Sequence, residues 1–258
     1  NSTIPFYYND LKSFNNVIDA NRDSIGVIIM EPVRAKGPDK GFLEHIRKVA
    51  DDIGAVLIFD EVTSGFHNNL GGIHLTYDIN PDIVIFAKAL GNGFPIGAIL
   101  GRREIMDVAQ STFISSTSWT ERVGFSAAIA TINKMENEPV HETLNNFGHK
   151  IKQGWKQMAE ENDVKIETSG ITTIPDFRFC YENSLAIQTY LTQEMLKNGY
   201  LAKTGTAVTY AYTDKILNMY LESLDAVFKN INRGLVEQNI EELLESEIKH
   251  STFKRLTD

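Results

Sequence analysis

Short apolar runs separated by amphipathic stretches dominate the first hundred residues. Runs rich in valine and isoleucine predict strands at 25–30, 55–59, 82–87 and 97–101. Such runs, with no polar alternation, are typical of strands buried on both faces of a parallel sheet. Residues 41–53 repeat apolar side chains at helical spacing and end at Gly54, a common helix stop. Strand, helix and strand in this order predict a βαβ unit, with further helices at 10–21 and from 103 onward.

Helices become longer and the apolar runs disappear beyond about residue 122. The expected helices span 124–135, 140–162, 184–198, 213–233 and, as a charged helix, 237–247. Shorter strand-like segments lie at 164–167, 177–180, 200–201 and 208–211. We therefore expect an α/β fold with a large domain over residues 1–122 and a smaller C-terminal α+β domain over 123–258. The large domain should contain a mostly parallel mixed sheet flanked by helices.

Composition narrows the class of protein. The formal net charge of −9 disfavours nucleic acid as a partner, because phosphate backbones select basic surfaces. No apolar run approaches the roughly 18 residues that cross a membrane, so we expect no membrane span. The single cysteine, Cys180, excludes an internal disulfide, and we expect it to be a small buried side chain. A reducing cytoplasm is therefore the expected location.

Two polar residues follow neighbouring strands of the predicted sheet. Asp60 ends the run at 55–59, and Lys88 ends the run at 82–87, just before the glycine-rich segment 91–95. Because functional groups gather at the carboxyl ends of parallel strands, a carboxylate and an amine should meet at one edge. An amine that forms a Schiff base, beside a carboxylate that keeps a pyridine nitrogen protonated, suits pyridoxal 5′-phosphate (PLP) chemistry. The alternatives are an aspartate that caps a turn and a solvated lysine.

These motifs carry a resemblance to a known family. The segments 28–33, 59–66 and 87–93 resemble the class III aminotransferases of PLP fold type I, and the resemblance covers nearly the whole chain. Within that class the chain looks most like the branch related to glutamate-1-semialdehyde 2,1-aminomutase, which the segments 199–202 and 210–214 also fit. The resemblance implies the fold type I architecture, PLP as cofactor, a small-molecule amino donor and carbonyl acceptor, and a homodimer with sites at its interface.

The resemblance also implies roles for five residues. Lys88 would carry PLP as a Schiff base and shuttle a proton, and Asp60 would pair with the pyridine nitrogen. Val62 would pack on one ring face, although a plain core valine would pack in the same way. Thr63 would lie near the ring hydroxyl. Thr117 would reach the cofactor phosphate of the neighbouring subunit, or it belongs to a simple helix N-cap run.

Departures from the family pattern leave the substrate open. Lys36 stands where relatives acting on ω-amino acids often carry a glutamate, and residues 203–206 replace a segment that often holds a carboxylate-binding arginine. Relatives also carry a further N-terminal part with the phosphate-binding loop, so the chain resembles a fragment. The expected function is a PLP-dependent aminotransferase; the alternatives are a glutamate-1-semialdehyde-type aminomutase and a truncated, non-catalytic chain.

The histidines give no metal-binding pattern. His67 and His74 flank Gly71 and Gly72 in a loop after the Asp60 strand. A contact with substrate or with another subunit is possible there, but a solvated loop is the favoured interpretation.

Overall fold

The structure, a computed structural model, describes residues 2–115, 117–119 and 121–251. The chain forms two compact units, Asn1–His141 and Glu142–Asp258. Among the described residues, no helix is long and apolar enough to cross a membrane.

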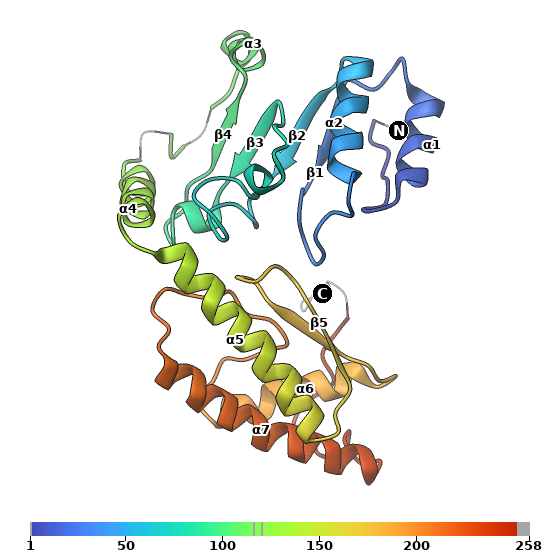
Figure 1. The fold of residues 1–258 in the computed structure, drawn as a ribbon, viewed down its shortest axis with the longest axis vertical. Coiled ribbons are helices and arrows are strands. Elements are labelled where there is room, and N and C mark those ends of the chain that lie inside the picture. The colour runs from blue at the N-terminus through green and yellow to red at the C-terminus, as the bar shows by residue number, and fades with distance from the viewer. Residues whose placement is uncertain (1, 116, 120, 252–258) are drawn as a thin grey trace. The chain divides into compact units, whose positions relative to one another are not determined.

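A four-stranded sheet forms the centre of the first unit (Figure 1). Its strands lie in chain order: β1 (Val27–Met30), β2 (Val56–Asp60), β3 (Ile83–Phe86) and β4 (Ala98–Gly101). The pairs β1–β2 and β2–β3 are parallel, and β3–β4 is antiparallel. The predicted α/β fold with a mostly parallel mixed sheet is therefore confirmed. Each parallel pair is joined by a long crossover connection, whereas the antiparallel strand β4 needs only a shorter one.

Two helices cover β1 and β2. Helix α1 (Leu11–Asn21) begins where the Asp10 side chain accepts a hydrogen bond from the Ser13 amide, and α2 (Phe42–Ile53) ends at Gly54, which adopts a left-handed φ of 70°. Their apolar faces pack on the sheet in one core cluster, whose fully buried members include Phe14, Ile46, Leu57 and Phe59. The apolar face of each helix that the sequence pattern predicts is therefore the face that packs on the sheet.

The other face of the sheet is open within this chain. Side chains alternate across a strand, and β1 alternates exposed and buried positions, with Val27 and Ile29 more than half exposed. Ile99 of β4 is also 60% exposed. The prediction that these strands are buried on both faces is therefore wrong for the chain as described: the apolar runs are present, but the described helices of this chain cover one face only.

The rest of the first unit consists of short turns and one long helix. The elements are η1 (Ile73–Tyr77), η2 (Lys88–Leu90), α3 (Arg103–Met106), η3 (Asp107–Ser111) and α4 (Val123–Asn137). Helix α4 lies against η2, and Ala128 joins a core cluster with Phe66, Phe86 and Leu90. Because of this packing, the compact units divide after α4, whereas the boundary expected from the sequence lies at 122/123, before it.

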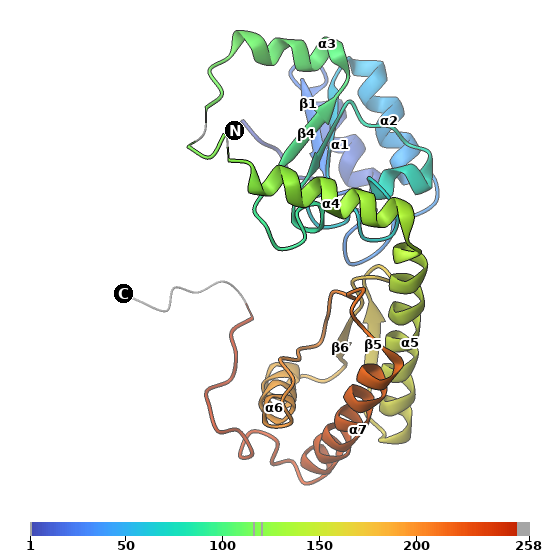
Figure 2. The same cartoon turned by 90° about the vertical axis from the view of Figure 1, so that its left-hand side faces the viewer.

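The second unit packs three helices with a two-stranded antiparallel sheet (Figure 2). Its elements are α5 (Val140–Glu161), β5 (Ile166–Ser169), β6 (Asp176–Phe179), α6 (Ser184–Lys197) and α7 (Asp214–Val236). Trp155 is fully buried, and its indole nitrogen donates to the Tyr220 hydroxyl at 2.9 Å. Phe177 and Phe228 complete this aromatic core. Thr213 caps α7 as its position in the sequence predicts.

Three local predictions for this unit are wrong. The segments 200–201 and 208–211 form no strand, although 204–208 runs beside 173–177 through hydrogen bonds such as Val208 N to Thr173 O. Residues 237–247 form turns instead of a helix, because Gln193 of α6 binds the backbone of Leu243 and Glu245. Cys180 is exposed, since it follows the last residue of β6.

The close approach of α5 to the loop before β6 yields a stability prediction. A Cβ at Gly148 would overlap the Thr172 carbonyl, whereas a Cβ at Gly154 of the same helix would meet only the movable end of Leu221, at 2.7 Å. Overpacking costs about 1–3 kcal/mol, which exceeds the roughly 1 kcal/mol that alanine gains over glycine in a helix. Gly148→Ala should therefore lower the free energy of unfolding measured in urea, and more than Gly154→Ala does. Equal effects of the two substitutions would contradict the close contact between α5 and this loop.

Candidate active site

The carboxyl ends of β2 and β3 form the candidate site. Asp60 lies opposite Ile85 in the parallel ladder, and the Glu61 amide donates to the Ile85 carbonyl at 2.9 Å. Lys88 follows β3 directly after Phe86 and Ala87. The structure therefore brings the carboxylate and the amine to one edge of the sheet, as the sequence predicts.

Lys88 occupies an unusual backbone conformation. Its φ is 41°, in the left-handed region, and its carbonyl accepts from Gly91 and Asn92 at 3.1 and 3.0 Å. A non-glycine residue held in this region costs on the order of 1 kcal/mol, and such strain often marks functional sites. The side chain is exposed, and its Nζ donates to Thr63 Oγ1 at 2.8 Å. The tight turn thus points the amine back toward the end of β2.

Asp60 has one engaged and one available carboxylate oxygen. Its Oδ1 accepts the Val62 amide at 3.0 Å, which is the turn-capping contact that the sequence allowed as an alternative. Its other oxygen accepts no hydrogen bond from any residue that the structure describes. The side chain is partly buried and shares the open face of the sheet with Ile58. Capping therefore leaves Asp60 able to bind a second group.

Val62 and Thr63 lie in the turn that follows Asp60. Both are partly buried, and the Gly65 amide closes the turn by donating to the Glu61 carbonyl at 2.9 Å. Thr63 is the residue that joins the two strand ends, because its hydroxyl accepts from Lys88. Four of the five predicted site residues are thus neighbours at one edge.

Thr117 lies apart from this cluster in sequence and in its contacts. It sits in an exposed turn between η3 and α4, and it forms no hydrogen bond with another described residue. Two apolar side chains of the same segment are exposed to solvent: Phe113 is 96% exposed and Trp119 is 60% exposed. Within one chain, no hydrogen bond among the described residues joins Thr117 to Lys88.

Sequence reasoning missed a buried pair beside the site. His74 is only 6% exposed, and its Nδ1 lies 2.5 Å from Oε1 of the fully buried Glu61. The expectation of a solvated loop is therefore wrong for His74. The alternation of side chains along β2 was the available signal, because Glu61 follows Asp60 and must point to the opposite side.

His67 is a second residue whose proximity to the site was not predicted from the sequence. It is partly buried, and burial lowers the pKa of its imidazole, with a further lowering from the positive charge of Lys88. This electrostatic interaction places His67 in the neighbourhood of the candidate amine. Its uncharged form is favoured there.

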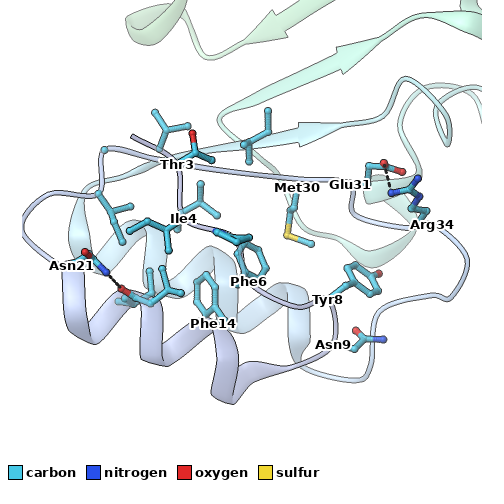
Figure 3. Close-up of a pocket in the computed structure, with 18 of the residues that line it drawn as sticks. Thr3, Ile4, Phe6, Tyr8, Asn9, Phe14, Asn21, Met30, Glu31 and Arg34 are labelled. Atoms are coloured by element: carbon cyan, nitrogen blue, oxygen red, sulfur yellow. Dashed lines mark hydrogen bonds and ion pairs between the residues drawn. The ribbon is translucent and has the colours of Figure 1, made fainter. Parts of the chain in front are cut away.

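A large cavity of the described chain lies elsewhere. It has a volume of about 1220 Å³ and lies beside β1. Figure 3 shows residues that line it, among them Ile4, Phe6, Phe14 and Met30, with Glu31 and Arg34 at one end. None of the predicted site residues lines it. The site is therefore defined by the convergence of strand ends and not by this cavity.

Comparison with known proteins identifies the family. The model of the family described as "Aminotransferase class-III" matches residues 7–222, which is most of the chain. The chain belongs to the class III aminotransferase family. Members of this family depend on PLP, so the resemblance drawn from the motifs is confirmed.

Individual relatives share more than half of their length with this chain. It is 31% identical to the 3-aminobutyryl-CoA aminotransferase of Cloacimonas acidaminovorans (strain Evry), over 89% of this chain and 58% of that protein. It is 29% identical to the glutamate-1-semialdehyde 2,1-aminomutase of Ignicoccus hospitalis, over 89% of this chain and 59% of that protein. The chain thus spans a little under three fifths of these curated relatives.

A solved structure establishes the fold class. The PLP internal aldimine form of the FumI protein from Sphingopyxis sp. MTA144 matches with a TM-score of 0.84 at 24% identity, over 90% of this chain and 58% of that chain. The predicted PLP fold type I architecture is therefore confirmed.

The residues at the strand ends fit PLP chemically. An exposed amine held in a strained turn can react with an aldehyde, and the available oxygen of Asp60 can accept a hydrogen bond from a ring nitrogen. Of the residues expected at the phosphate, this chain supplies Thr117, which lies apart from the other four in one copy of the chain.

The pKa of His67 provides a direct check of this geometry. In an NMR titration, His67 should protonate at lower pH than an ordinary histidine, because burial and Lys88 both disfavour its cationic form. Removing the charge with Lys88→Met should raise the His67 midpoint part of the way, since burial remains. His141 is the control, because burial alone lowers its pKa and Lys88 does not contribute. An unchanged His67 midpoint would show that the two groups are not close.

Proposed function

We propose that the protein carrying this chain is a PLP-dependent aminotransferase that holds its cofactor through Lys88. The observation that supports this most strongly is the convergence of Lys88, Thr63 and Asp60 at the ends of two parallel strands. Membership of the class III family supports it independently. When bound, PLP supplies an aldehyde that condenses with amines and a protonated ring that withdraws electrons from the substrate.

Lys88 has two tasks in this proposal. Its Nζ would hold the cofactor covalently, and as a free amine it would move a proton at the substrate carbon. The Thr63 hydroxyl, 2.8 Å from Nζ, orients the amine in the free protein. We assign Thr63 to the neighbourhood of the ring hydroxyl, where its own hydroxyl would serve as a hydrogen-bond partner.

Asp60 would hold the pyridine nitrogen of PLP in its protonated form. The oxygen not used by the Val62 amide is available to a ring N–H, and its negative charge would raise the proton affinity of that nitrogen. Val62, two positions further along the chain, would pack on a ring face. The Asp60 turn cap therefore supports the proposed function, because the capped oxygen fixes the direction of the other.

The substrates we propose are a small-molecule amino donor and a carbonyl acceptor. A second candidate, an aminomutase that shifts an amino group within one molecule, is favoured by the similarity to the Ignicoccus hospitalis protein. Reacting the PLP form with single amino donors separates the two: a transaminase releases a free keto product in this half-reaction, whereas an aminomutase requires no separate donor. A non-catalytic chain would show neither reaction.

We further propose a homodimer in which Thr117 serves the site of the neighbouring subunit. The exposed apolar residues around Thr117 support this, since Phe113, Ile114 and Trp119 are each more than half exposed. A helix N-terminus close behind it, that of α4, is a common place for a phosphate. We place the protein in the cytoplasm, where the one exposed thiol of Cys180 stays reduced.

Replacing Lys88 should remove covalent cofactor binding. After PLP addition and borohydride reduction, mass spectrometry of the naturally occurring protein should find the reduced adduct on the peptide that contains Lys88. In Lys88→Ala that adduct should be lost and transamination should fall by several orders of magnitude, because the amine that bonds to the cofactor is gone. Lys48→Ala, an exposed lysine on α2, is the matched control and should change neither measurement. Adduct yield and activity that survive in Lys88→Ala would overturn the assignment.

The dimer proposal makes a prediction about mixed subunits. Lys88→Ala and Thr117→Ala proteins should each have low activity, and heterodimers should regain one intact site if the two residues serve one site from different chains. Random reassortment of equal amounts restores roughly a quarter of the sites. The measurement is turnover after mixing, with heterodimers verified by two affinity tags. Verified heterodimers without recovered turnover would count against Thr117 as a phosphate ligand across the interface.

A further inference from the structure

We propose that Glu61 is a positioning residue that holds Asp60 and Thr63 in place for the cofactor, an inference that rests on the proposed function. Glu61 is fully buried and follows the strand that delivers Asp60. It points away from the open face on which Asp60 lies, so it would not touch the cofactor itself.

Four hydrogen-bonding groups contact the Glu61 carboxylate, one from Ser64 and three from residues 73–74. Its Oε2 accepts the Ile73 amide at 2.5 Å and the Ser64 hydroxyl at 3.3 Å. Its Oε1 accepts the His74 amide at 3.0 Å and lies 2.5 Å from His74 Nδ1. A buried carboxylate needs such partners, because a charge removed from water without them costs several kcal/mol.

This set of contacts ties the loop at residues 72–74 to the end of β2. Gly72 makes the approach possible, because a Cβ there would overlap the His74 ring and would lie 2.8 Å from Glu61 Oε1. The Phe66 amide donates to the Gly71 carbonyl at 2.8 Å and closes the intervening segment, which carries His67. The segment from Glu61 to His74 is therefore a closed loop clamped at its base.

The backbone of Glu61 connects these buried contacts to the residues of the candidate site. Its amide binds Ile85 of β3, and its carbonyl accepts from Gly65. Asp60 lies directly before this short turn and accepts the Val62 amide, whereas Thr63 lies inside the turn and accepts from Lys88. Loss of the buried carboxylate would release the turn and misdirect both side chains, in the way that outer ligands orient the inner ligands of a metal site.

A purely structural role for Glu61 is the competing explanation, and Asp82 provides the matched control for it. Asp82 is also a buried carboxylate of this unit, and it accepts the Leu57 amide at 2.8 Å as well as Arg47 and Arg102. It precedes β3 and so lies at the opposite end of that strand from Lys88. Asp82→Asn should therefore lower stability without reaching the site.

The experiment compares Glu61→Gln, His74→Gln and Asp82→Asn in the naturally occurring protein, with Asp60→Asn as a reference for a damaged site. The readouts are the melting temperature of the free protein, the dissociation constant for PLP, and the visible circular dichroism of bound PLP. Circular dichroism reports how the ring is oriented, which stability alone does not change. We expect Glu61→Gln to weaken PLP binding about ten- to a hundredfold, the range found for lost outer-layer supports, and to alter the dichroism in the sense of Asp60→Asn.

His74→Gln keeps both backbone donors to Glu61 and should show a smaller change in the same direction, so it decides the question if Glu61→Gln does not fold. Asp82→Asn should lower the melting temperature but bind PLP as the unmodified protein does. If Glu61→Gln and His74→Gln lower only the melting temperature, as Asp82→Asn does, the positioning role is overturned. If the unmodified protein binds no PLP, the proposed function fails instead, which keeps the two failures distinct.

Discussion

The parallel pairing of β2 with β3 is the constraint on which the candidate site depends. Asp60 lies opposite Ile85, and Lys88 follows Ile85 by three residues, just beyond the end of β3. A register slip of one residue would send Asp60 to the opposite face of the sheet. The hydrogen bond from Glu61 to Ile85 continues the ladder beyond the last residue of β2, so the turn that carries Thr63 starts from a fixed point.

Around this pairing, polar groups divide between two sides of one turn. On the open side, Asp60 and Thr63 keep hydrogen-bonding capacity for a ligand. On the buried side, Glu61 uses its whole carboxylate to bind Ser64, Ile73 and His74. In the proposed function the open side would face the cofactor, and the hydrogen bonds on the buried side hold the turn that carries it. Lys88, on the open side, also has a strained backbone with a φ of 41°, and such strain often occurs at functional sites.

The open face of the sheet and the packing of α4 could not be predicted from the apolar pattern of single strands and helices. Valine and isoleucine runs indicate that a strand can be buried on both faces, but not which segment covers each face. Here α1 and α2 cover one face, and Val27, Ile29 and Ile99 of the other remain exposed. Helix α4 packs on the first unit through Ala128, Ile132 and Met135, and its apolar positions alone did not show which unit they would join.

The sequence by itself determined the order of the elements, the two residues at neighbouring strand ends and the family, because these depend on local periodicity, capping residues and short motifs. The structure decided the features that require distant segments to meet. Among these are the burial of His74 against Glu61, the coupling of His67 to Lys88, and the turns at 237–247 that Gln193 holds against α6. Such contacts cannot be predicted from periodicity, since a loop histidine and a charged C-terminal segment look solvated until another part of the chain supplies their partners.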